Sequence, residues 1–142
     1  MLFSKSFDYA LRGVLYISSA GELKKKIFLE EISSQLAIPK YFLGKILNKL
    51  VKKGILHSTK GPYGGFSIND STKKTTLLIL LRTVDGFHPF NSCVLKMKKC
   101  NAANACPLHD RMAHLRDNFY EEMNSTTIED VLKGTSSNLF TK

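Results

Sequence analysis

The residues best suited to chemistry lie in one short segment of the sequence. All three cysteines of the chain, Cys93, Cys100 and Cys106, fall within it, and His109 follows the last of them after two residues. A short segment that carries several ligands loses less conformational entropy on binding than ligands scattered along a chain. Clustered thiolates are typical ligands of metal ions and iron–sulfur clusters. The segment therefore predicts a metal or iron–sulfur centre, with these four residues as candidate ligands.

Other uses of the cysteines stay open. Three cysteines and one histidine also suit a tetrahedral zinc ion, although gaps of six and five residues between the cysteines are wide for such a site. A metal-free alternative is a set of reactive thiols that sense oxidants directly. We do not expect an enzyme, because Cys106 and His109 have no evident orienting third group, phosphate-binding glycine loop or paired carboxylates to accompany them.

The composition favours a polyanionic partner. Lysine and arginine together number 21 against 12 aspartates and glutamates, which gives the 142-residue chain a formal net charge of +9. Its longest apolar run, Leu77–Leu81, is far shorter than the roughly 20 residues of a membrane span. An odd number of cysteines also argues against a secreted disulfide scaffold. We expect a cytoplasmic protein whose partners include neither a membrane nor a small-molecule substrate.

The first half of the chain has the element order of a winged helix-turn-helix. The predicted elements are helices over 4–19 and Lys40–Lys53, a short helix of about two turns between them, and strands over Ile55–Ser58 and Phe66–Ile68. Pro39 suits the first turn of the third helix, and Gly54 is its expected C-cap. The apolar stripes expected to face the core contain Phe7, Ala10, Leu11, Val14, Leu15, Leu29, Ile32, Leu36, Phe42, Leu43, Ile46, Leu47 and Leu50. Asp8 and Arg12 lie off these stripes.

The second half predicts more helix. Leu77–Leu81 is apolar on every side and favours a buried helix that ends near Gly86, with a strand as the alternative. A long amphipathic helix is marked by Leu108, Met112, Leu115, Phe119 and Met123, and Thr126 with Glu129 forms the expected capping box of a last helix. The fold class is thus mainly α with a small β-hairpin wing. We expect a DNA-binding unit over 1–75, a linker helix, cysteine loop and dimerisation helix over 76–134, and a disordered tail over 135–142.

One region combines the features expected of a nucleic-acid interface. No aspartate or glutamate occurs from Ile32 to Asn69, whereas six lysines do. The second helix of a helix-turn-helix enters the major groove, and a wing contacts the adjacent backbone or minor groove. The candidate DNA-binding residues are Lys40, Tyr41, Lys45, Asn48, Lys49, Lys60 and Tyr63. A solvated helix face is the alternative, but such faces normally mix charges of both signs.

These motifs together resemble the Rrf-two family of bacterial regulators, which includes the iron–sulfur cluster regulator and the nitric-oxide-sensing repressor. The resemblance runs nearly end to end and rests, besides the three cysteines, on Ser4–Arg12, Ile38–Pro39 with Tyr41 and Leu43, Lys60–Phe66 and Thr127–Leu132. It implies a homodimer, joined through the long helix after the cysteine loop, that binds a pseudo-palindromic double-stranded DNA operator.

The resemblance offers two candidates for a fourth ligand beside the three cysteines. His109 matches the histidine ligand of proteins that resemble the cluster regulator and favours a two-iron two-sulfur cluster. Asp8 matches a carboxylate ligand of nitric-oxide-sensor relatives and would favour a four-iron four-sulfur cluster instead. We expect His109 and the two-iron form, with zinc as the alternative. The predicted function is a transcriptional regulator that senses redox state, nitric oxide or iron–sulfur status through this centre.

Overall fold

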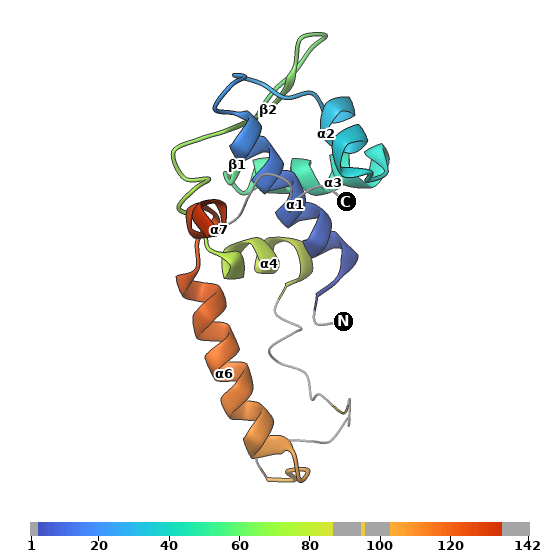
Figure 1. Cartoon of the computed structure of the whole chain (residues 1–142). Coiled ribbons are helices and arrows are strands. Elements are labelled where there is room, and N and C mark those ends of the chain that lie inside the picture. Colours follow the sequence, from blue (N-terminus) through green and yellow to red (C-terminus); the bar gives the residue numbers. More distant parts are fainter. Residues whose placement is uncertain (1–2, 87–94, 96–102, 135–142) are drawn as a thin grey trace.

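The computed structural model describes residues 3–86, 95 and 103–134 (Figure 1). Its elements are α1 (Lys5–Ala20), α2 (Leu29–Leu36), α3 (Lys40–Lys52), β1 (Leu56–Thr59), β2 (Gly65–Ile68), α4 (Leu77–Asp85), α6 (His109–Ser125) and α7 (Ile128–Gly134). The described chain is therefore mainly helical with one two-stranded hairpin, as predicted. Cys93, Cys100 and the tail predicted over 135–142 lie outside the described residues. No helix within the described residues is long and apolar enough to span a membrane.

Helix α1 forms the centre of the core. Ser4 begins it, and its hydroxyl accepts a hydrogen bond from the backbone N–H of Phe7 at 3.1 Å. Phe7, Ala10, Val14 and Leu15 are buried as the periodicity predicted, while Leu11 is half-buried. The core extends over both sides of the boundary predicted at residue 75, since α4 packs on α1 and Leu78 belongs to the same cluster. The division into two units stays a prediction.

Arg12 was predicted to lie off the stripe that faces the core, but it is buried, with only 8% of it exposed. Its guanidinium donates a hydrogen bond of 2.5 Å to the backbone oxygen of Leu36 and lies 3.4 Å from the Asp8 carboxylate. A buried cation is tolerated only where hydrogen bonds and an opposite charge offset its loss of water. Arg12 therefore joins α1 to the end of α2, where the chain turns toward α3.

The α2–α3 turn is tight and closed by local hydrogen bonds. Ala37 takes the left-handed conformation at φ 53°, and the backbone N–H of Ile38 donates to the Ser33 carbonyl at 3.1 Å. The Ser33 hydroxyl returns a 2.6 Å bond to the carbonyl of Ile38. Pro39, predicted to lie in the first turn of α3, is instead the N-cap that precedes it, at φ −55° and ψ 125°. The helix-turn-helix predicted from this spacing is confirmed.

The hairpin that follows α3 forms the wing. Strands β1 and β2 are antiparallel, with Leu56 opposite Ile68. Residue Ile27 extends this sheet by exchanging two backbone hydrogen bonds with Phe66, which anchors the wing to the segment before α2. At the tip, a Cβ on Gly64 would lie 2.1 Å from the Thr59 carbonyl oxygen, so only glycine fits there.

The segment Leu77–Leu81 is helical, which excludes the alternative of a strand. Thr76 caps α4 through a 3.2 Å bond from the backbone N–H of Ile79 to its hydroxyl. The predicted capping box of α7 was wrong by one residue. Thr127 and Asp130 form the reciprocal pair, at 2.9 and 3.1 Å, because an isolated bridge between Thr76 and Thr127 sets the start of that helix. Hydrogen bonds from Thr127 lower the pKa of Asp130.

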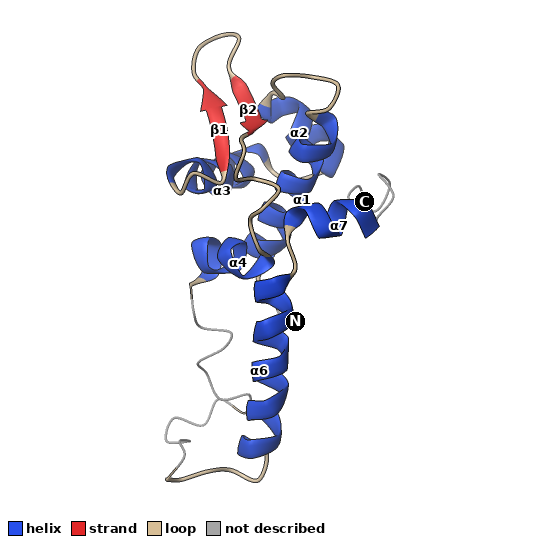
Figure 2. Ribbon diagram, turned by 90° about the vertical axis from the view of Figure 1, so that its left-hand side faces the viewer, coloured by secondary structure: helices blue, strands red, loops and turns tan. Residues whose placement is uncertain are grey.

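Helix α6 projects from the body, on the side opposite the wing (Figures 1 and 2). Within the described residues, α6 meets the core through its C-terminal part, where Met123 is buried and Phe119 and Tyr120 are half-buried. The guanidinium of Arg82 on α4 donates a 2.5 Å bond to the Tyr120 hydroxyl and fixes this junction. Leu115, farther along the projecting part, is 58% exposed. A helix of 17 residues spans about 25 Å, and the N-terminal part of α6 extends away from the body (Figure 1).

Candidate nucleic-acid interface and cysteine segment

Helix α3 separates its apolar and polar residues cleanly. Leu43, Ile46, Leu47 and Leu50 are buried against the core. The predicted DNA-binding residues of this helix, namely Lys40, Tyr41, Lys45, Asn48 and Lys49, are all exposed. No ion pair within the described part of the chain engages the lysines at 45 and 49. The exposed face of α3 is therefore available to a phosphate backbone.

Phe42 was predicted to be buried, and this was wrong, because 55% of it is exposed. Leu43, the next residue, begins the buried stripe, and successive residues of an α-helix are about 100° apart around its axis. Phe42 consequently lies at the edge of the stripe and shares a side of the helix with Lys45 and Lys49, three and seven residues on. Helical periodicity assigned it to the core because its side chain is apolar.

Tyr41 organises the first turn of α3. Its ring meets the ring of Phe42 edge to face, with the two centroids 5.7 Å apart and an interplanar angle of 72°. The ammonium of Lys45 lies 4.7 Å from the centroid of the Tyr41 ring, which is a cation–π distance. An aromatic pair and a cation thus form one continuous row on the exposed side of the helix.

The candidate interface is less purely basic than the sequence predicted. Lys40, at the start of α3, forms an ion pair with Glu30 of α2. The hydrogen bond from Lys40 lowers the pKa of the Glu30 carboxyl below its usual range. The acid-free stretch of sequence therefore does not make an acid-free surface, because the helix-turn-helix brings a carboxylate from the preceding helix beside the recognition helix.

The wing presents its two candidate residues to solvent. Tyr63 is 83% exposed, and Lys60 is exposed beside the turn of the hairpin. The left-handed backbone of Gly61, at φ 103°, makes this turn possible. Because α3 and β1 pack on each other, the wing lies beside α3 (Figure 2).

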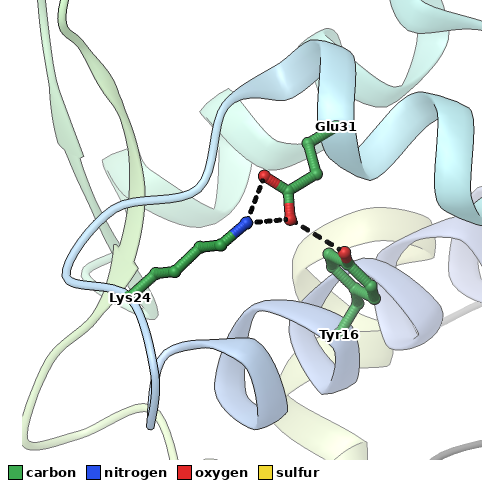
Figure 3. A network of polar contacts seen from close by, with 3 residues as sticks. All are labelled: Tyr16, Lys24 and Glu31. Atoms are coloured by element: carbon green, nitrogen blue, oxygen red, sulfur yellow. Dashed lines mark hydrogen bonds and ion pairs between the residues drawn. The ribbon is translucent and has the colours of Figure 1, made fainter.

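A polar network that the sequence did not indicate fixes α2 against α1 (Figure 3). The Glu31 carboxylate accepts hydrogen bonds from the Tyr16 hydroxyl at 3.0 Å and from the Lys24 ammonium at 3.0 and 3.1 Å. The hydrogen bond from Lys24 is the main cause of the lowered pKa of Glu31. Burial is the main cause of the raised pKa of Tyr16. These residues come from α1, a loop and α2, so only the fold brings them together.

Cys106 and His109 share one turn at the start of α6. The backbone N–H of His109 donates to the carbonyl of Cys106 at 2.9 Å, and both residues are half-buried. Asp8, the other candidate ligand, instead lies on α1 within 3.4 Å of the Arg12 guanidinium. Within the described residues, no group of three or more potential metal ligands converges. Because Cys93 and Cys100 fall outside those residues, the complete ligand set stays a prediction.

Comparisons with known proteins agree with this architecture. A protein of Aquifex aeolicus (strain VF5) that is named as a helix-turn-helix transcriptional regulator is 31% identical to this chain over 142 residues. The match covers 99% of this chain and 97% of that protein. The solved structure of CymR (YrzC), the global cysteine regulator of B. subtilis, matches with a TM-score of 0.75 at 21% identity, over 94% of this chain and 98% of that one. T. potens IscR matches with a TM-score of 0.71 at 16% identity, over 94% of this chain and 87% of that one.

A family model covers nearly the whole chain. The Rrf2 model, described as an iron-dependent transcriptional regulator, matches residues 3–134. The match includes α1, the helix-turn-helix, the wing, the cysteine segment and both C-terminal helices. The resemblance drawn from the sequence motifs is thereby confirmed. The chain belongs to the Rrf2 family of transcriptional regulators.

Proposed function

We propose that the chain binds a specific double-stranded DNA operator through α3 and the wing. The observation that most supports this proposal is the exposed face of α3. Its lysines and aromatic rings lie beside a hairpin that packs on the same core. Lysine ammonium groups contact phosphates and set the register of the protein on the duplex. The first turn of α3 reaches base edges in the major groove, and Lys60 and Tyr63 follow the backbone beside it.

The protein acts as a homodimer joined through α6. The projecting part of this helix exposes Leu115, and Ile79 on α4 is 45% exposed. A helix that meets its own body only at one end gains buried apolar surface from a second copy. Two copies would also present two recognition helices to the two halves of a pseudo-palindromic operator. The expected measurement is a dimer mass by analytical ultracentrifugation, with a shift toward monomer for Leu115→Glu.

The sensing centre is a two-iron two-sulfur cluster held by Cys93, Cys100, Cys106 and His109. Support comes from the donor set, since three thiolates and an imidazole suit such a cluster, and from the turn that Cys106 shares with His109. When bound, the cluster would supply a redox- and nitric-oxide-sensitive group. Asp8 is the less favoured fourth ligand because the nearby Arg12 guanidinium already offsets its charge.

Two measurements test these proposals separately. Anaerobic purification followed by visible absorption and analysis of iron, sulfide and zinc identifies the centre. Brown protein with stoichiometric sulfide supports the cluster, colourless protein with one zinc per chain supports a structural zinc site, and metal-free protein supports direct thiol sensing. Selection of duplexes from a random-sequence library tests operator binding. If no common site is enriched, with the cofactor present or absent, the proposal of sequence-specific recognition is refuted.

A further inference from the structure

The first turn of α3 exposes two aromatic side chains where a DNA-binding helix usually carries polar ones. Tyr41 is 67% exposed and Phe42 is 55% exposed. Single apolar side chains scattered over a surface are normal. These two are neighbours in contact, on the helix face that carries the lysines, and Lys45 covers one of the rings. The exposure of this aromatic pair therefore calls for a functional explanation.

The major groove offers one apolar group at its base edges, the 5-methyl group of thymine. Phenylalanine has no hydrogen-bonding atom, so Phe42 can recognise neither a phosphate nor the polar edge of a base. The other exposed residues of the first turn already have partners within the protein. Lys40 pairs with Glu30, and the Tyr41 ring contacts both the Phe42 ring and the Lys45 ammonium.

We propose that Phe42 is a specificity-determining residue that contacts the 5-methyl group of a thymine in each operator half-site. Tyr41 is its positioning residue, because the edge-to-face contact limits the directions that the Phe42 ring can take. Lys45 and Lys49, three and seven residues farther along the same side of α3, would neutralise phosphates flanking that base. This inference rests on the proposed use of α3 as the recognition helix.

The thymine methyl group can be removed without changing any hydrogen bond, by replacing thymidine with deoxyuridine. A site selected by the wild-type protein from a random duplex library is synthesised with each thymine replaced in turn, and affinities are measured by fluorescence anisotropy at one salt concentration. Burying one methyl group changes affinity by about fourfold. The wild-type dimer should lose about fourfold at one thymine per half-site and about fifteenfold when both are replaced.

Variants then assign the preference to a side chain. Phe42→Ala should bind thymine and deoxyuridine duplexes equally, whereas Phe42→Leu should keep part of the preference because it remains apolar. Leu23→Ala is the matched control, since Leu23 is 92% exposed in the loop after α1 and lies outside the proposed interface. Circular dichroism melts confirm that each variant is folded.

The outcomes separate this inference from the proposed function. Equal wild-type affinity for thymine and deoxyuridine at every position would overturn the role of Phe42 and leave operator binding intact. A Phe42→Ala variant that keeps the wild-type preference would also overturn it. Failure of the wild-type protein to bind any duplex at low salt would instead remove the proposed function.

Discussion

Replacement of Glu30 by glutamine should strengthen DNA binding and make it more sensitive to salt. Glu30 forms an ion pair with Lys40, so this lysine is partly neutralised within the protein. Lys40 also lies in the first turn of α3, where the helix dipole disfavours a positive charge, and the carboxylate compensates for this. The substitution releases the ammonium to a phosphate and removes a negative charge beside the duplex.

The expected magnitude follows from counting lysines. If the five lysines at 45, 49, 52, 53 and 60 each neutralise one phosphate, log affinity falls with log salt at a slope of about 4.5 per protomer. Adding Lys40 raises this slope to about 5.4. The assay is fluorescence anisotropy with a labelled duplex between roughly 50 and 200 mM salt, the range over which this counterion effect is large.

Two controls isolate the effect to the ion pair. Glu129→Gln removes an equal charge from the pair that Glu129 makes with Lys133 on α7, and should leave the slope unchanged. The double variant Glu30→Gln/Lys40→Gln should return to the wild-type slope. In the wild type the Lys40 ammonium is paired with Glu30, and in the double variant it is absent, so in neither protein does it neutralise a phosphate. A slope for Glu30→Gln that equals or falls below the wild-type value would refute the assignment of Lys40 to the interface.

Three further predictions concern the scaffold. Arg12→Met should lower the free energy of unfolding by about 1.5–3 kcal/mol in chemical denaturation, because the buried carbonyl of Leu36 loses a charged donor; an unchanged midpoint would contradict this. Gly64→Ala should displace the wing tip and lower the salt slope by about 0.9 per protomer, with the helical circular dichroism signal retained. Glu31→Gln should lower the melting temperature near neutral pH but not at pH values well below the ordinary glutamate pKa of 4.5. The hydrogen bond from Lys24 depresses the folded-state pKa of this carboxyl, so its stabilisation is complete above the unfolded-state value and is lost as the pH falls through the folded-state value. An equal loss at both pH values would show that charge plays no part.

Local sequence signals were sufficient to predict the helix-turn-helix and the wing. Pro39 and Gly54 bracket α3, although Pro39 is the N-cap of the helix rather than part of its first turn. Gly54 adopts the positive φ of 77° that a glycine permits just after a helix end. The glycine-rich tip likewise implied a tight hairpin. Such features depend on residues a few positions apart, so a single sequence contains all the information needed.

Features that depend on contacts between elements were missed. Arg12 is buried because its acceptor is the carbonyl of Leu36, 24 residues away. The Glu30–Lys40 pair joins two helices. Phe42 is exposed because the elements that pack on α3 cover Leu43 but not the edge of the apolar stripe, where Phe42 lies. Periodicity distinguishes polar from apolar positions, but it does not show which polar residue finds a buried partner or which apolar residue stays outside.

Within the described residues, helix α6 packs on the core through Phe119, Tyr120 and Met123, near its C-terminal end. Over its length of about 25 Å, a tilt of about 10° at the junction with α4 displaces the Cys106 end by about 4 Å. A ligand that fixed the Cys106 end in place would therefore also fix the angle at this junction, where the Arg82 guanidinium bonds the Tyr120 hydroxyl.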